Sequence, residues 1–428
     1  MHNKPPRGEV SPWAIALAGA ATLATAMGIG RFAFTPLLPM MLADGVVDLP
    51  GASWLASANY LGYLVGALLC TLQPWVATSF RPLAFVAPTT WLRAGLLATC
   101  GLTVCMALPL PAWWPWLRFL AGVASAFVFV FTSGWCLARL AERQASSLGG
   151  IMYTGPGAGI AISGVLASGM VALHWQATAG WVIFGVLACA LTALVWRTFD
   201  ARPALTASDQ TAAAEVAEPK TVTTANTANS EAGLSLSVSR LQVGWLAVAY
   251  GLDGLGYIIT ATFLPVIARQ VMPGSPWLDL FWPLFGLAVV AGAVISTRIP
   301  LKGDLRYVLA VSYLVQAIGV IMTVWLPTPL GFAMGSLLLG LPFTAITFFA
   351  MQEVRRLKPL GAASHMGLLT AVYGLGQVAG PPLAAWLLSR SPTVGQGFNL
   401  ALEIAAGVLM LGALMFVGLA RMYPKTSI

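Results

Sequence analysis

Apolar runs of about 20 residues recur along this chain from one end to the other. We place twelve of them at 12–41, 53–72, 86–107, 113–138, 148–173, 178–197, 241–268, 277–297, 305–326, 329–352, 364–388 and 398–420. A charged fraction of 8%, against roughly 25% in an ordinary soluble domain, is too small to cover a soluble globule of this size. In lipid every backbone N–H and C=O must be paired within the protein, which only helices and closed barrels achieve. Strands of a membrane barrel have only about 10 residues, so runs of about 20 residues indicate helices. The sequence therefore predicts an all-α membrane protein with twelve transmembrane helices.

The net charge of +8 is distributed unevenly between the two ends of these helices. With the N-terminus in the cytoplasm, 18 of the 22 Lys and Arg residues fall on the cytoplasmic side, and only Arg269 and Arg390 fall outside. This asymmetry follows the positive-inside rule and predicts a multi-pass protein of a bacterial inner membrane with both termini cytoplasmic. The expected partner of the basic charge is thus the lipid bilayer and not nucleic acid. The other two cations, Arg31 and Arg118, lie inside predicted helices.

Several classes of protein are disfavoured by what the sequence lacks. Five cysteines without a CxxC pair and three scattered histidines suggest no disulfide framework, haem or metal site. A phosphate-binding GxxxxGK[ST] loop is missing, so we expect no cofactor, no direct use of ATP and no enzyme activity. A signal peptide ending near Ala26 is an alternative for the first run, but the apolar stretch continues to Leu42.

Residues 200–240 are small, polar and free of aromatic residues, in a chain that is 10% aromatic. Such a segment cannot bury enough apolar surface to order itself. We expect a flexible cytoplasmic linker there, between an N-terminal six-helix bundle at 1–199 and a C-terminal six-helix bundle at 241–428.

The two predicted bundles share sequence features at a nearly constant offset. GRFAFTPLLP at 30–39 aligns with GYIITATFLP at 256–265, an offset of 226, and GPGAGIA at 155–161 aligns with GPPLAAW at 380–386, an offset of 225. Two matches on either side of the linker indicate an internal duplication. Pseudo-symmetric halves are typical of transporters in which two bundles rock around a site between them.

Five segments carry a resemblance to a known family. They are GIGRFAFTPLLP (28–39), SANYLGYLVGALL (57–69), RFLAGVASAF (118–127), YTGPGAGIA (153–161) and GLGYIITATFLP (254–265). Together they resemble the major facilitator superfamily, and the first and last resemble its branch typified by bacterial YbfB and YjiJ proteins. The resemblance implies the major facilitator fold in a monomer, and secondary transport of a small organic solute by alternating access, with protons as the coupling ion. One departure is the stretch at 73–85, which lacks the aspartate that many members carry between helices 2 and 3.

Arg31 stands in a run that is otherwise apolar, where a charge at the membrane centre costs about 2.5–3.5 kcal/mol. It either reaches the outer headgroups or faces a hydrated crevice where an anionic solute or an acidic partner compensates it. Asp253 is the best candidate partner, because the repeat offset places it one helical turn from the level of Arg31. Burial and a neighbouring arginine act on a carboxyl in opposite directions, so Asp253 is also the expected proton-coupling group.

Polar residues recur at three- and four-residue steps on three predicted helices, so each set shares a helix face. The sets are Tyr250, Asp253, Tyr257 and Thr260; Thr370, Tyr373 and Gln377; and Asn59, Gly62 and Tyr63. Packing between helices is the alternative explanation for any one set. The substrate site is expected to comprise Arg31, Asn59, Tyr63, Tyr153, Tyr257, Tyr373 and Gln377. An anionic solute is favoured by Arg31. The alternative is a drug-like exporter with an aromatic pocket formed by Trp135, Tyr153, Phe281, Trp282 and Tyr373.

Arg118 matches an RxxxGxxxA spacing that the resemblance associates with proton coupling, although it could instead anchor the helix beside the tryptophans at 113–116. Two Gly-Pro pairs, Gly155–Pro156 and Gly380–Pro381, are expected to act as conformational hinges because they remove a backbone donor and side-chain bulk. In related antiporters a glycine precedes the first pair by one turn, but Ile151 stands there.

Overall fold

A computed structural model describes residues 11–79, 87–145, 148–199, 228–275, 277–299, 303–358 and 362–424. The described residues form helices joined by turns. The first half of the chain contains α1 (Pro12–Leu23), η1 (Ala24–Ile29), α2 (Phe34–Ala43), α3 (Leu49–Ser79), α5 (Pro88–Cys105), η2 (Pro111–Trp113), α6 (Trp114–Glu142), α7 (Gly149–Met152), α8 (Thr154–Ala172) and α9 (Ala177–Val195). The second half contains α11 (Ala228–Val271), η4 (Leu278–Leu280), α12 (Phe281–Ser296), α13 (Leu305–Trp325), α14 (Pro329–Gly340), α15 (Phe343–Leu357), α16 (Ala362–Arg390) and α17 (Val394–Met422).

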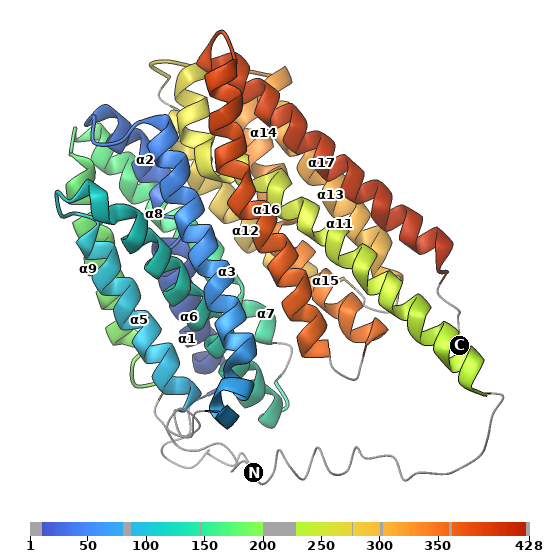
Figure 1. Ribbon diagram of the computed structural model, residues 1–428. Coiled ribbons are helices and arrows are strands. Elements are labelled where there is room, and N and C mark those ends of the chain that lie inside the picture. The colour runs from blue at the N-terminus through green and yellow to red at the C-terminus, as the bar shows by residue number, and fades with distance from the viewer. Residues whose placement is uncertain are drawn as a thin grey trace, which may run out of the picture.

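These helices confirm the predicted all-α membrane fold with two six-helix bundles (Figure 1). Within the described residues, ten helical stretches are long and apolar enough to cross a membrane. Helix α5, with 18 residues, and α16, with 29, complete the set of twelve, since at 1.5 Å per residue they extend over about 27 and 43 Å. We call the side at which α1 begins and α17 ends the terminal side of the molecule.

The first span is not the continuous helix that its apolar run predicts. A π-helical segment, η1, follows α1, and residues 30–33 form a turn before α2 begins at Phe34. The backbone N–H of Gly30 bonds to the carbonyl of Thr25, and that of Phe32 to Met27, each five residues back. π-Bulges of this kind often occur at functional sites.

The two bundles are in direct contact in the halves of the helices away from the terminal side. Hydrogen bonds cross between them there: Thr35 Oγ1 donates to the carbonyl of Ala261 at 2.9 Å, and Ser57 Oγ to the carbonyl of Val378 at 3.0 Å. Tyr60 Oη and Thr262 Oγ1 are also 2.9 Å apart. Helix pairs α3–α16 and α8–α12 form the flanks of this contact. This side of the molecule is therefore closed by bonds between the bundles.

The segment expected as a linker is helical at its C-terminal end. Helix α11 begins at Ala228, inside the expected 200–240 range, while residues 200–227 lie outside the described part of the chain. Once α11 is held by its neighbours, continuing the helix adds one hydrogen bond per residue, which explains how a sequence without an apolar face can extend it.

Candidate functional site

A chain of hydrogen bonds joins the two bundles at the centre of the molecule. Arg31 is 3% exposed, and its Nη2 donates to Gln377 Oε1 at 2.6 Å. Gln377 Nε2 in turn donates to the hydroxyl of Tyr257. Arg31 comes from the turn between η1 and α2, Gln377 from α16 and Tyr257 from α11. Burial excludes the interpretation that Arg31 reaches the headgroups.

Aromatic rings surround the Arg31 guanidinium. Its central carbon lies 4.1 Å from the ring centroid of Tyr63, 5.1 Å from that of Tyr60 and 5.4 Å from that of Phe32. Cation–π contacts of this kind stabilise a cation where no carboxylate neutralises it. Arg31 Nε is also buried and has no hydrogen-bond partner, so part of the guanidinium remains available.

The ion pair expected between Arg31 and Asp253 is not formed in this structure. Asp253 is fully buried in α11, and neither of its carboxylate oxygens has a hydrogen-bond partner. The expectation assumed a regular helix around Arg31, whereas the π-helical segment and the turn alter the direction of its side chain toward Gln377. A buried carboxyl without a partner is costly when ionised, and such groups inside membranes are usually functional.

Three tyrosines beside Asp253 form a stack between α11 and α16. The ring of Tyr373 lies 4.8 Å from that of Tyr250 and 5.9 Å from that of Tyr257, with interplanar angles of 18° and 19°. Tyr250 and Tyr257 flank Asp253 on one helix face, as the spacing predicts. The hydroxyls of Tyr250 and Thr347 are 3.0 Å apart, which connects this face to α15.

Arg118 has a backbone role that its position in the sequence does not reveal. It is 2% exposed, so it is not an interfacial anchor. Its Nη1 donates to the carbonyl of Gly30 at 3.3 Å and its Nη2 to that of Arg31 at 3.2 Å. These carbonyls lie in the turn that interrupts the first span. Arg118 thus stabilises the turn that carries Arg31.

Asn59 and Tyr153, both expected in the substrate site, lie at its margin. Asn59 Nδ2 donates to the backbone carbonyl of Arg118 at 2.9 Å, which joins α3 to α6. Tyr153 is half-buried, and its ring centroid lies 6.2 Å from that of Phe129, which lies 6.5 Å from that of Tyr63. The structure therefore brings Arg31, Tyr63, Tyr257, Tyr373 and Gln377 together and connects the other two less directly.

The two Gly-Pro pairs differ in their surroundings. Helix α8 begins at Thr154, after a break at Tyr153, so Pro156 falls in its first turn, where a missing N–H leaves no bond unmade. Helix α16, by contrast, continues through Pro381. A Cβ on Gly155 would lie 2.1 Å from the carbonyl oxygen of Ala20, and one on Gly380 2.2 Å from Ile258 Cγ2. Both glycines permit close helix packing, and only the first lies beside a break.

Phe343 is a central residue that the sequence analysis did not select, and Trp282, expected only in the aromatic pocket of the exporter alternative, packs against the same ring of Phe32. Phe343 begins α15, and its ring lies 4.9 Å from that of Tyr257 and 6.2 Å from that of Phe32. The ring centroid of Trp282 lies 6.4 Å from that of Phe32, and the buried indole nitrogen of Trp282 has no hydrogen-bond partner. The signal for Phe343 is Pro342, which separates α14 from α15 and exposes a helix start at the centre of the bundle.

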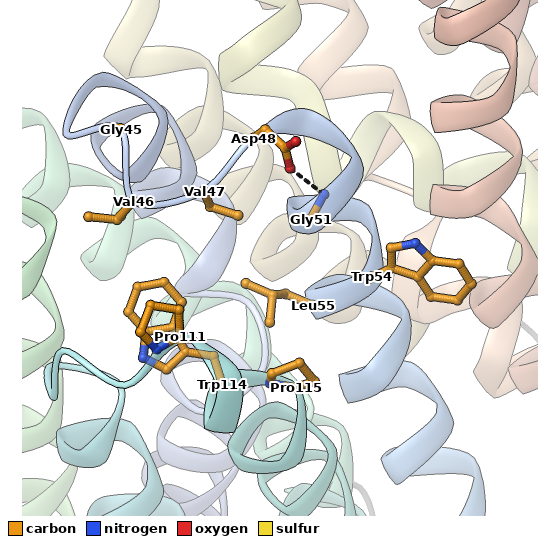
Figure 2. A pocket seen from close by; sticks show the side chains of 10 residues that line it. All are labelled: Gly45, Val46, Val47, Asp48, Gly51, Trp54, Leu55, Pro111, Trp114 and Pro115. Carbon is orange, nitrogen blue, oxygen red and sulfur yellow. Dashed lines mark hydrogen bonds between the residues drawn. The ribbon is translucent and has the colours of Figure 1, made fainter.

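A concave region lies at the end of the N-terminal bundle away from the terminal side. Figure 2 shows this pocket, which has a volume of about 640 Å³ and is lined by Gly45, Val46, Val47, Asp48, Gly51, Trp54, Leu55, Pro111, Trp114 and Pro115. Its one carboxylate, Asp48, accepts from the backbone N–H of Gly51 at 2.8 Å and caps α3. None of the predicted site residues lines it.

On the terminal side, buried charges connect three helices of the C-terminal bundle. Arg306 Nη2 lies 2.7 Å from Asp304 Oδ2, Arg306 Nε lies 3.7 Å from Glu353 Oε1, and Glu353 also pairs with Arg356. Arg306 Nη1 donates to the carbonyl of Leu419 at 3.0 Å. These bonds hold α13, α15 and α17 together. In the N-terminal half, Arg81 of the stretch at 73–85 lies outside the described residues.

Comparisons with known proteins agree with this architecture. The model of a family described as "uncharacterised MFS-type transporter YbfB" matches residues 23–417. Among solved structures, the nucleoside transporter NupG superposes with a TM-score of 0.70 at 15% identity, covering 95% of this chain and 99% of that one. A D-xylose–proton symporter superposes with a TM-score of 0.70 at 14% identity, covering 94% and 96%. At 14–15% sequence identity, these superpositions show a shared fold alone. No curated protein matches the sequence significantly.

Proposed function

Because the chain belongs to the YbfB-type branch of the major facilitator superfamily and is a secondary transporter, we propose that it moves a small organic anion by alternating access, coupled to protons. The observation that carries this proposal is the buried bond between Arg31 and Gln377, since it lies between the two bundles and connects them. A solute that binds Arg31 competes with Gln377. Binding would therefore alter a contact that holds the bundles together.

The proposal assigns proton coupling to Asp253. The carboxyl is fully buried and has no hydrogen-bond partner, so its charged form is disfavoured until water or a cation reaches it. Rocking of the bundles would change that access. Protonation in one conformation and release in the other would couple proton movement to transport. Arg118 would act by holding the turn that carries Arg31.

The positive-inside distribution supports an orientation in a bacterial inner membrane with the terminal side in the cytoplasm. The side closed by bonds between Thr35 and Ala261 and between Ser57 and Val378 would then face outward. We expect the monomer to be the functional unit, because the central site involves both bundles of one chain.

A multisubstrate exporter is the second candidate, and the aromatic rings around Arg31 favour it. An exporter that works as a proton antiporter would move protons opposite to its solute. The direction of proton movement separates it from a symporter. A sensor with a transporter fold would bind a solute without moving it.

The test uses purified protein in proteoliposomes that contain a pH-sensitive dye. Addition of a transported anion should change the internal pH, and Asp253→Asn should abolish that change while retaining exchange of labelled solute across the membrane. Asp48→Asn, a substitution of an exposed carboxylate at the far end of the molecule, serves as the matched control. Coupled transport by Asp253→Asn at the wild-type rate would contradict the assignment.

A further inference from the structure

Only one of the two donors on the Nε–Nη2 edge of Arg31 has a partner in the protein. Nη2 donates to the single amide oxygen of Gln377, while the neighbouring Nε is buried and has no partner. The Nε–Nη2 edge of a guanidinium matches the two oxygens of a carboxylate, which it binds through two parallel hydrogen bonds. Gln377 therefore occupies half of a site for which a carboxylate supplies the complete ligand.

One guanidinium edge at this site can take up a ligand by displacing a side chain, and it is that of Arg31. Arg118, the other arginine buried at this level, also has an Nε without a partner, but both of its Nη nitrogens donate to backbone carbonyls, those of Gly30 and Arg31. The unpartnered carboxyl of Asp253 adds no positive charge and repels a second negative group whenever it is ionised. A ligand with one carboxylate fills this edge, whereas the second carboxylate of a dicarboxylate finds no comparable edge and is repelled by an ionised Asp253.

The surroundings of Arg31 are mainly aromatic. Phe32 and Phe343 lie 6.2 Å apart, and Phe343 lies edge-on to Tyr257 at 4.9 Å. Tyr63 covers one face of the guanidinium at 4.1 Å. A sugar-like solute would lose hydrogen bonds to water that these rings cannot replace. A flat apolar ring, in contrast, packs favourably against them in edge-to-face or offset geometry.

We infer that the substrate is an aromatic monocarboxylate. Its carboxylate takes the place of the Gln377 amide oxygen on the Nε–Nη2 edge of Arg31, and its ring packs among Phe32, Tyr257 and Phe343. The inference rests on the proposed function for the identity of the site. It adds the charge, the hydrogen-bonding capacity and the shape of the solute.

The first experiment measures binding to the wild-type protein in detergent by calorimetry, because protonated weak acids cross bilayers unaided. Benzoate is compared with benzyl alcohol, which lacks the charge, with cyclohexanecarboxylate, which lacks the flat ring, and with succinate and gluconate. We expect benzoate to bind at least about tenfold more tightly than each, a difference of about 1.4 kcal/mol. Equal binding of benzyl alcohol, a preference for succinate or gluconate, or no binding of benzoate would overturn the inference.

The second experiment uses two substitutions and a control. Arg31→Lys keeps the charge but removes the planar edge, and should weaken benzoate binding about tenfold or more. Phe343→Leu should reduce the preference for benzoate over cyclohexanecarboxylate. Arg390→Gln, at the exposed end of α16 beside Trp386, should leave binding unchanged. Unaltered benzoate binding by Arg31→Lys would overturn the inference. If a variant does not fold, the ligand series on the wild-type protein still tests the inference.

The two proposals can fail separately. If benzoate does not bind but another anion drives proton movement in proteoliposomes, the substrate class is wrong and the transport function stands. If benzoate binds with the expected preferences but no solute moves protons, the site is correct and the coupled function is wrong.

Discussion

Thr35 and Ala261 occupy equivalent positions in the two halves of the chain and are hydrogen-bonded to each other, with Thr35 Oγ1 2.9 Å from the Ala261 carbonyl. Their separation of 226 residues equals the offset between the repeats at 30–39 and 256–265. Equivalent residues touch only near the axis that relates the halves. This contact therefore marks where the pseudo-two-fold axis passes through the closed side of the molecule.

A covalent link at this axis should stop the transport cycle. In a background in which the five native cysteines are replaced, Thr35→Cys combined with Ala261→Cys should form a disulfide under oxidation, because the side chain of residue 35 already contacts the backbone of residue 261. The proposed alternating access requires this side to open, so oxidation should abolish solute flux and a reductant should restore it. Each single variant is the control. Normal flux through a fully cross-linked protein would contradict the rocking of these bundles.

Arg118 should matter more for folding stability than Arg31 does. Arg118→Met would leave two buried carbonyls, those of Gly30 and Arg31, without these hydrogen bonds. Each unsatisfied carbonyl lowers the free energy of unfolding by about 1–3 kcal/mol. Removal of the buried charge offsets part of this loss, because the charge no longer has to be desolvated. Arg31→Met removes a bond to one side chain. Thermal unfolding in detergent should therefore show a larger decrease in Tm for Arg118→Met. A smaller decrease for Arg118→Met than for Arg31→Met would rule out the capping role.

The contact between α8 and α12 should not tolerate added bulk. A Cβ on Gly286 would lie 2.4 Å from the Ala161 backbone nitrogen and 2.7 Å from the carbonyl oxygen of Gly157, so the two helices must separate to accept it. Overpacking of this kind costs about 1–3 kcal/mol in the conformation that contains the contact. A cost of about 1.4 kcal/mol lowers the population of that conformation about tenfold. Gly286→Ala should slow solute flux accordingly. Gly407→Ala, where nothing lies within 4 Å, should not, and similar slowing in both variants would exclude this explanation.

The architecture could be predicted from the sequence because lipid leaves few alternatives. Apolar runs and the repeat offset depend on composition and spacing, and these features survive local irregularity. The shared face of Tyr250, Asp253 and Tyr257 was likewise predictable, because α11 is a regular helix around these residues and its period is fixed at 3.6.

The partner of Arg31 could not be predicted for the opposite reason. The residues at 24–33 have the composition of an ordinary apolar helix, yet they form a π-helical segment and a turn. Distant side chains bond to this irregular stretch: Arg118 donates to the carbonyls of Gly30 and Arg31, and Ser125 donates to that of Ala26. Counting helical turns from Asp253 therefore gave the wrong partner. Pairing across bundles depends on side-chain directions that a one-dimensional pattern does not contain.

The charge cluster on the terminal side should make stability depend on pH through Asp304. Burial opposes ionisation of this carboxyl, but hydrogen bonds from the Arg306 side chain and backbone N–H, with the Arg306 charge, outweigh it and lower the pKa of Asp304. A carboxyl whose pKa is lower in the folded state stabilises the protein above its unfolded pKa. That contribution is lost as pH falls below about 4.

Asn also caps helices well, so Asp304→Asn removes the charge and retains the cap of α13. Thermal unfolding should show a lower Tm for Asp304→Asn at pH 7 and a smaller difference from wild type at pH 3. A difference that stays constant from pH 7 to pH 3 would show that the charge of Asp304 does not stabilise this end of the bundle.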